Sequence, residues 1–271
     1  MDDFVIPLYP EAGEKRPLPN LYLDHNIRQE KQPFVYANFV VSLDGRIAIP
    51  HPSGQGLTVP KAIVNERDWR LFQELAAQAD LIISSGRYLR DWADGRAQEI
   101  LQTDDPRFAD LRRWREEQDL KPQPDIAIIS GSLDFPIPDV LTSNGRHAII
   151  FTSANPDPKR VAEIEAQAGQ VFIVGEEAVD GQQMVHKMGE LGYQTVYSAA
   201  GPRILHMLLT GGVLDRLYLT HASRILGGSP FASVVEGGVL GTAVNFQLHS
   251  LTFDPAGLDG LGQLFLAYNR V

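Results

Sequence analysis

The 271-residue sequence contains no cysteine, which excludes a disulfide framework, thiolate metal ligands and a thiol nucleophile. It also has no apolar run of about 18 residues, the length that a membrane-spanning helix needs. Positive charge is scarce, because 24 lysines and arginines stand against 34 aspartates and glutamates, and the net charge is −10. A general nucleic-acid binder needs a basic face, so this balance argues against one. We therefore expect neither a nucleic-acid partner nor a membrane partner.

The first residues, Met1-Asp2-Asp3, are acidic, unlike the positively charged start of a secretory signal peptide. A chain without cysteine also fits a reducing compartment. Both features predict a cytoplasmic protein.

Several catalytic motifs are missing as well. The sequence has no GxxxxGK[ST] phosphate loop and no GxGxxG after its first apolar run, which disfavours a P-loop NTPase and a standard Rossmann dinucleotide fold. It has no GxSxG nucleophile elbow. The seven histidines are scattered, with no HExxH and no pair at helical spacing, so we expect no metal site.

Length and composition allow one large or two modest domains, and 44% of apolar residues suffices for a full core. Residues 1–33 are rich in charge and carry five prolines, which predicts an extended N-terminal arm that packs on something else or stays mobile. Nothing in the composition marks a second domain. We therefore expect a single domain over residues 34–271.

Apolar runs typical of buried strands alternate with helical spacing through most of the chain. Strands are predicted at residues 34–43, 81–83, 126–129, 148–151, 171–174, 195–197 and 214–219. Helices are predicted at residues 60–79, 111–117, 159–168, 182–191 and 203–209. After Gly227 the rhythm changes, and residues 244–253 and 261–268 are predicted as strands with no helix between them. The pattern indicates an α/β fold with a mostly parallel central sheet and an antiparallel C-terminal hairpin.

Ligands of such folds bind outside the carboxyl ends of the strands, where four predicted loops consist largely of small residues. These loops are Ser42-Leu43-Asp44-Gly45-Arg46, Ser84-Ser85-Gly86-Arg87, Ser130-Gly131-Ser132 and Ala199-Ala200-Gly201-Pro202. The last loop leads directly into a helix, whose free N–H groups favour a phosphate, although a tight turn is the commoner reason for such residues. Asp44 follows a buried strand, where an acid either caps the turn or binds a ligand hydroxyl.

Two segments carry a family resemblance. Residues 42–48 read SLDGRIA, and residues 199–205 read AAGPRIL, followed by GVLDRL and ILGG. They resemble the S-L-D-G-[RK]-I-A, E-G-G-P-x-L, G-L-V-D-E-L and L-L-G-G signatures of the riboflavin-biosynthesis reductases, the RibD C-terminal domain family. ADLIISSG at residues 79–86 is a weaker match. The matches come in family order and span residues 34 to 268.

The resemblance implies a dihydrofolate reductase-like fold, with three αβα layers around a mostly parallel sheet and an antiparallel C-terminal hairpin. It implies an enzyme that uses NADPH to reduce the sugar imine of a pyrimidine carrying a ribosylamino phosphate, or of a pterin-like relative. It also implies a homodimer with a small-molecule substrate.

By the same resemblance, Asp44 is the expected catalytic residue and binds the substrate together with Ser42 and Arg46, whose guanidinium pairs with a phosphate. The expected cofactor-binding residues lie in the small-residue loops and at strand ends: Leu43, Gly45, Ser84, Ser85, Gly86, Arg87, Ser130, Thr152, Ala199, Ala200, Gly201, Pro202 and Arg203. Arg87 and Arg203 are candidates for charge near a 2′-phosphate. Gly201 is expected to take a positive φ, which a β-branched residue does not easily adopt.

The sequence also departs from the family pattern. Ala199 and Ala200 replace the acid and the first glycine of the second signature, and Ser84 and Arg87 replace small residues. These departures favour a non-catalytic, nucleotide-binding member of the same fold as the alternative function. A nucleotide-binding α/β protein of another class, such as a glycosyl or phosphoryl transferase, is a third alternative.

Overall fold

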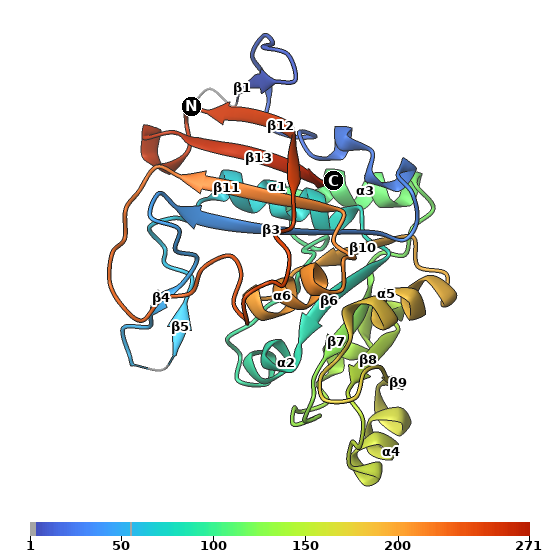
Figure 1. The fold of residues 1–271 in the computed structure, drawn as a ribbon. Coiled ribbons are helices and arrows are strands. Elements are labelled where there is room, and N and C mark those ends of the chain that lie inside the picture. Colours follow the sequence, from blue (N-terminus) through green and yellow to red (C-terminus); the bar gives the residue numbers. More distant parts are fainter. Residues whose placement is uncertain (1–3, 55) are drawn as a thin grey trace.

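The computed structural model describes residues 4–54 and 56–271. Its strands are β1 (Phe4–Tyr9), β2 (Arg16–Pro17), β3 (Phe34–Ser42), β4 (Ile49–Pro50), β5 (Leu57–Thr58), β6 (Leu81–Ser85), β7 (Asp125–Ile129), β8 (Ala148–Thr152), β9 (Gly169–Ile173), β10 (Thr195–Ser198), β11 (Arg216–Ala222), β12 (Phe246–Asp254) and β13 (Gln263–Arg270). Its α-helices are α1 (Glu66–Ala77), α2 (Gly86–Ala93), α3 (Ala109–Glu117), α4 (Pro158–Gln167), α5 (Gly181–Glu190) and α6 (Pro202–Thr210). One eleven-stranded sheet runs through the molecule in the order β2-β1-β12-β13-β11-β3-β10-β6-β7-β8-β9 (Figure 1).

The sheet is parallel from β11 to β9 and antiparallel at its other end. β3 pairs in parallel with β10 on one side and with β11 on the other. β6, β7, β8 and β9 continue the parallel pairing. β13 runs antiparallel to β11, and β12 antiparallel to β13. The predicted α/β fold with an antiparallel C-terminal hairpin is therefore confirmed.

Helices cover both faces of the parallel part, which gives three layers. α1 and α3 pack on one face through Leu71, Leu75 and Leu111, and α5 and α6 pack on the opposite face through residues such as Met184 and Leu208. In Figure 1, α6 lies in front of the sheet and α1 behind it. α2 and α4 add a smaller apolar cluster against β7 and β8. No helix of the described ranges is long and apolar enough to cross a membrane.

Two helix starts differ from the sequence expectation. The helix predicted from residue 60 begins at Glu66, because the Asn65 side chain caps it by accepting the N–H groups of Arg67 and Asp68 at 3.0 and 3.1 Å. α2 begins at Gly86 directly after β6, where only a loop was expected. Its one turn of apolar spacing, centred on buried Leu89, is too short a signal to stand out among charged residues.

Residues 4–33, the described part of the expected arm, pack on the domain. β1 pairs antiparallel with β12 at the edge of the sheet, where prolines are tolerated. Leu21 and Ile27 are buried in the same cluster as α1. The buried Glu74 carboxylate of α1 accepts the N–H groups of Asn20 and Tyr22 at 2.7 and 2.9 Å. Residue 33 as a domain boundary stays a prediction.

Glu74→Ala tests how strongly α1 holds this segment. The substitution removes the acceptor of the buried Tyr22 N–H and of the Asn20 N–H. It also removes one of the two carboxylates that hold the Arg70 guanidinium, which keeps Asp110. We expect a loss of about 3 kcal/mol in the free energy of unfolding, measured by urea denaturation. Glu163→Ala is the matched control, since Glu163 is half-exposed in a surface ion pair and should cost below about 0.5 kcal/mol. Equal losses for the two variants would contradict this prediction.

Candidate functional site

The predicted site loops follow strands that are neighbours in the sheet. β3, β10, β6, β7 and β8 lie side by side and parallel, so their carboxyl ends open at one edge. α1 and α6 each return the chain to the start of a parallel strand, so their N-termini lie at this edge as well. The structure thus places the expected substrate and cofactor loops at the same edge of the sheet, while their binding roles stay predictions.

Asp44 organises the loop after β3. Its Oδ1 accepts hydrogen bonds from the Ser42 hydroxyl at 2.5 Å and the Leu226 N–H at 3.2 Å. Its Oδ2 accepts from the Gly227 N–H at 2.8 Å and from Arg46 Nη1 at 2.5 Å. The carboxylate therefore accepts a hydrogen bond within its own turn, as an acid that caps the turn does. It also holds this loop against the segment after β11. A hydrogen bond from Asp44 to a substrate stays a prediction.

These contacts keep Asp44 ionised. The Ser42 hydroxyl, followed by the Gly227 N–H, lowers the pKa of Asp44 from 3.8 to about 2. A general acid must hold its proton at the working pH. Asp44 is therefore suited to fixing the loop or orienting a ligand, and unsuited to donating a proton near neutral pH.

Arg46 is held inside the same cluster of loops. Its Nη2 donates to the Gly228 carbonyl at 3.1 Å, and its guanidinium carbon lies 4.3 Å from the centroid of the Phe231 ring. Its Nε is buried and has no hydrogen-bond partner among the described residues. Because both terminal nitrogens are already engaged, the structure gives Arg46 a loop-holding contact, and its phosphate contact stays a prediction.

Two other residues of this loop face solvent. Leu43 is 60% exposed, and its N–H donates to the Arg224 carbonyl at 2.8 Å. Gly45 turns the chain with φ +80°, a conformation that favours glycine. Both residues therefore shape the loop through their backbone.

The expected cofactor residues on β7 and β8 lie at adjacent strand ends. The buried Thr152 hydroxyl donates to the Gly131 carbonyl at 3.4 Å, and Ser130 Oγ accepts the Leu133 N–H at 3.1 Å. These contacts hold the loop after β7 beside the end of β8.

At the end of β6, Ser84 is buried and Ser85 is half-buried. Gly86 starts α2, and a Cβ there would lie 3.1 Å from the Phe135 ring, so a side chain fits poorly. The Arg87 side chain is 67% exposed, and its Nη2 donates to the Leu57 carbonyl at 3.1 Å. Arg87 therefore lies beside the small β4–β5 hairpin.

The Ala199–Arg203 turn joins β10 to α6. Gly201 caps α6 with φ −76° and ψ 179°, and its carbonyl accepts the Ile204 N–H at 3.1 Å. The expected positive φ at Gly201 is wrong, because the turn is made with extended backbone that any residue adopts. A Cβ at Gly201 would meet no atom within 4 Å, so the glycine faces open space.

The neighbours of Gly201 differ in exposure. Ala199 packs against the cluster on the α1 face, and Ala200 packs against the cluster on the α6 face. Pro202 is the first residue of α6, and Arg203 is exposed beside it. A positive side chain thus stands at a helix N-terminus that borders open space.

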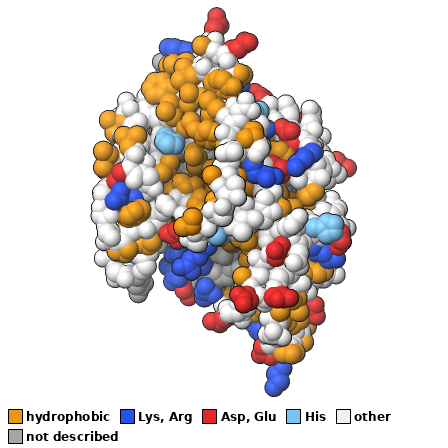
Figure 2. Space-filling view, viewed as in Figure 1, with side chains coloured by type: hydrophobic (Ala, Val, Ile, Leu, Met, Phe, Trp, Pro, Cys, Tyr) orange, Lys and Arg blue, Asp and Glu red, His pale blue; other side chains and the backbone are white. Residues whose placement is uncertain are grey.

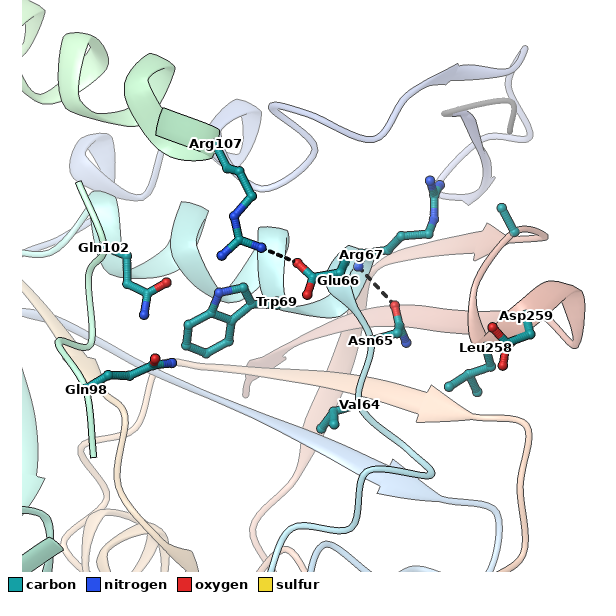
Figure 3. Close-up of a pocket in the computed structure, with 11 residues that line it drawn as sticks. Val64, Asn65, Glu66, Arg67, Trp69, Gln98, Gln102, Arg107, Leu258 and Asp259 are labelled. Carbon is teal, nitrogen blue, oxygen red and sulfur yellow. Dashed lines mark hydrogen bonds and ion pairs between the residues drawn. The ribbon is translucent and has the colours of Figure 1, made fainter. Parts of the chain in front are cut away.

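A cleft of about 780 Å³ opens at the start of α1 (Figure 3). One side is formed by the Trp69 indole with the side chains of Gln98, Gln102 and Arg107. Its other lining residues are Val64, Asn65, Glu66, Arg67, Ala256, Leu258 and Asp259. The cleft combines one aromatic face with two side-chain amides and a guanidinium.

Sequence reasoning missed this cleft. Trp69 fits the apolar spacing of the helix predicted over residues 60–79, and Gln98 and Gln102 lie in a segment for which no element is predicted. The one available signal was Asn65, an N-cap residue type ahead of an apolar helix. None of the residues predicted to bind substrate or cofactor belongs to the lining described above.

Asp68 is a buried acid in the same turn of α1. It is 8% exposed, and it stands in sequence between the cleft residues Arg67 and Trp69. Burial raises the pKa of Asp68 from 3.8 to about 6, and a hydrogen bond with the Thr220 side chain of β11 opposes the shift. Asp68 is therefore able to exchange a proton near neutral pH, which Asp44 is not.

An α/β sheet with small-residue loops and two helix N-termini at one carboxyl edge is an arrangement found in many nucleotide-binding folds. A family model described as "RibD C-terminal domain" matches residues 33–258. The chain belongs to this family, as the sequence resemblance predicted.

Curated relatives and solved structures agree with that assignment. One relative is the 2,5-diamino-6-ribosylamino-4(3H)-pyrimidinone 5′-phosphate reductase of Methanothermobacter thermautotrophicus. The two sequences are 24% identical over 206 residues, which cover 76% of this chain and 85% of the relative. A second relative is the protein of the same name from Archaeoglobus fulgidus. It is 22% identical over 211 residues, which cover 76% of this chain and 87% of the relative.

Two solved structures share the fold. A pyrimidine reductase-like protein of Corynebacterium diphtheriae superposes with a TM-score of 0.65 at 18% identity, covering 88% of this chain and 92% of that one. The Saccharomyces cerevisiae riboflavin biosynthesis reductase Rib7 superposes with a TM-score of 0.57 at 16% identity, covering 93% and 99%.

Asp44→Asn tests the loop contact through pH. The folded pKa of Asp44, about 2, lies below its ordinary value of 3.8, so its contribution to stability is present above pH 3.8 and is lost as pH falls through 2. We expect wild type to exceed the variant in free energy of unfolding by a constant amount from pH 7 to about 4. That difference should shrink toward pH 2. Asp104→Asn, which replaces an exposed acid, is the control. A stability difference between wild type and Asp44→Asn that grows on acidification would contradict the loop-holding role of ionised Asp44.

Proposed function

We propose that the protein is an NADPH-dependent reductase of a pyrimidine that carries a ribosylamino phosphate. The sugar imine carbon takes a hydride and the adjacent nitrogen takes a proton, which gives a ribitylamino product. The observation that carries this proposal is the open carboxyl edge of a RibD C-terminal domain fold, with a substrate-sized cleft at the start of α1. The curated relatives are reductases of a substrate of this kind by name.

The residues at the carboxyl edge fit a dinucleotide. The N–H groups of Gly201 and Arg203 donate to no acceptor within the described residues, and open space lies beyond Gly201. A pyrophosphate at this helix start would accept both N–H groups. Ser130 and Thr152 would line the rest of the cofactor, and Arg203 would favour a 2′-phosphate. When bound, NADPH supplies the hydride.

The cleft at α1 fits the substrate. The Trp69 face offers a stacking surface for a planar pyrimidine, and the amides of Gln98 and Gln102 match its alternating carbonyl and amino groups. Arg107 would supply positive charge for the phosphate, although it also pairs with Glu66 and with Asp105, each at 2.7 Å. This placement leaves the Asp44 loop to border the sugar at the end of β3.

Asp68 is the group suited to supply the proton. It stands in sequence between the lining residues Arg67 and Trp69, although its own buried side chain is not part of the lining. Its pKa of about 6 leaves a protonated fraction near neutral pH. The Thr220 side chain fixes its carboxyl group from the sheet side. Asp44, held ionised by the loop, is the orienting group in this scheme.

The proposal includes three further predictions about the protein. They are the cytoplasmic location, the homodimer and the absence of a nucleic-acid partner. The non-catalytic alternative rests on Ala199 and Ala200, which replace an acid and a glycine.

The direct assay follows NADPH oxidation in the presence of the ribosylamino pyrimidine phosphate. We expect turnover with NADPH and weaker binding of NADH. Gly201→Val should keep the fold, because its backbone is extended and its Cβ meets no atom, yet fill the proposed phosphate space and raise the NADPH dissociation constant at least tenfold. Binding of NADPH without turnover would favour the non-catalytic alternative. If the Gly201→Val variant binds as well as wild type, the phosphate does not lie at this turn.

Asp68→Asn tests the proton donor. Because the acid form donates, wild-type kcat should fall as pH rises through about 6, and the variant should lose about 100-fold or more in kcat together with this pH dependence. The folded pKa is raised, so ionised Asp68 costs stability above pH 6. The variant should therefore be more stable at pH 7, by up to about 3 kcal/mol. A variant with wild-type kcat and an unchanged pH profile excludes Asp68 as the donor.

A further inference from the structure

A second pocket lies at the opposite edge of the sheet from the Asp44 loop. Its volume is about 440 Å³, and it is formed by the end of α6, the end of β13 and residues 240–245 ahead of β12. Because α6 ends shortly before β11 starts, and β13 ends beside that start, the pocket lies where the parallel strands begin. We call it the amino-edge pocket. None of the residues proposed for substrate or cofactor lines it.

Arg270 supplies the positive charge of the amino-edge pocket. Its Nε donates to the Leu214 carbonyl at 2.8 Å, which fixes the guanidinium. A Cβ added to the lining residue Gly212 would lie 3.6 Å from Arg270 Nη1, so the guanidinium borders the pocket. Nη1 and Nη2 donate to no acceptor among the described residues, and Arg270 forms no ion pair with them. Both terminal nitrogens are therefore available to a ligand.

Little negative charge opposes Arg270. Of the eleven lining residues, all of them described, Arg270 alone has a charged side chain. Asp215 is a neighbour, since its carbonyl accepts the Arg270 N–H, but its carboxylate is held by the Val35 N–H at 2.9 Å and by Lys31 at 3.1 Å. Figure 2 shows acidic side chains most crowded in the lower part of this face, over α4 and β9, whereas β13 ends in the upper half of Figure 1. In a chain of net charge −10, the pocket is thus a place that attracts an anion.

The end of α6 does not cancel this attraction. A helix C-terminus carries partial negative charge on its unpaired carbonyls. Here the carbonyls of residues 207, 208 and 209 accept the N–H groups of residues 211, 213 and 212 at 2.9 to 3.1 Å. Gly212 closes this turn with φ +62°, a conformation that favours glycine. The last turn of α6 therefore presents few bare carbonyls to a ligand.

The segment ahead of β12 adds backbone donors. The N–H groups of residues 241–244 donate to no acceptor among the described residues. Gly241 faces open space, because a Cβ there would meet no atom within 4 Å. Successive free N–H groups are a common component of anion sites, since each one donates to a different oxygen.

The remaining lining sets the size and chemistry of the ligand. Leu209 is buried, and Leu240 and Val244 pack against the same apolar cluster, which gives the pocket a hydrocarbon wall. Thr210 and Thr242 add hydroxyl groups. The volume falls within the range of small-molecule sites and exceeds what a bare phosphate ion fills. A guanidinium donates two parallel hydrogen bonds to a phosphate, which has more oxygens for the remaining donors than a carboxylate has.

We propose that the amino-edge pocket binds a small phosphate monoester. Arg270 and the N–H groups of residues 241–244 bind its phosphate, and its organic part packs against Leu209, Leu240 and Val244. The site is separate from the proposed reductase site, because the Asp44 loop and the start of α6 lie at the other edge of the sheet. The proposal does not depend on the reductase activity.

Calorimetric titration with phenyl phosphate and with inorganic phosphate tests the site. We expect phenyl phosphate to bind at least tenfold more tightly, because its ring covers the hydrocarbon wall. Arg270→Gln should raise the phenyl phosphate dissociation constant of this site at least tenfold, with an unchanged circular dichroism spectrum. Gly241→Val is the second variant and should weaken binding as well, since its side chain would enter the open space beside the free N–H groups.

Arg107→Gln and Arg203→Gln are the matched controls, because both arginines are exposed and both are phosphate candidates of the reductase site. We expect neither variant to change the site that Arg270→Gln weakens. Binding that survives both Arg270→Gln and Gly241→Val, or that only the control variants weaken, overturns the proposal. Equal affinity for the two probes assigns the pocket to the free ion and overturns the ester.

Discussion

The parallel pairing of β3 with β10 and β11 is the constraint on which the site depends. Ala37 lies opposite Ser198 on one side and Leu217 on the other. β3 and β11 end together at Ser42 and Ala222, whereas β10 ends earlier, at Ser198. A slip of one residue would move each apolar side chain of β3 to the opposite face, and both faces are covered by helices. The ladder therefore fixes where the Asp44 loop leaves the sheet. It also places the starts of α1 and α6 at the same edge.

Two aspartates at this edge have opposite environments. Hydrogen bonds to its charged form lower the pKa of Asp44, whereas burial raises that of Asp68. A pair of carboxyl groups with separated pKa values is a common arrangement in acid–base catalysis. In the proposed reaction Asp44 stays charged and orders the loop after β3, and Asp68 exchanges a proton. A buried acid with a raised pKa costs stability at neutral pH, which is typical of a functional site.

The fold was predictable because its signals are local. The run Phe34–Ser42 is mostly apolar, which is typical of a strand covered on both faces, and the later parallel strands follow the same rule. The edge loops were predictable for the same reason, since each follows a strand. The backbone conformation at Gly201 was not predictable, because glycine adopts both positive and negative φ and the sequence does not show which sign this turn uses. The cleft was not predictable either, because Trp69 and Gln98 meet only through packing of distant segments.

The central claim is that this edge delivers a hydride to an imine carbon of the substrate. The most direct measurement uses NADPH that carries deuterium at both C4 positions of the nicotinamide, with mass spectrometry of the product. We predict one deuterium, located on the former imine carbon of the ribitylamino chain. A product formed without deuterium, or a folded protein that binds NADPH and yields no product, would contradict the claim.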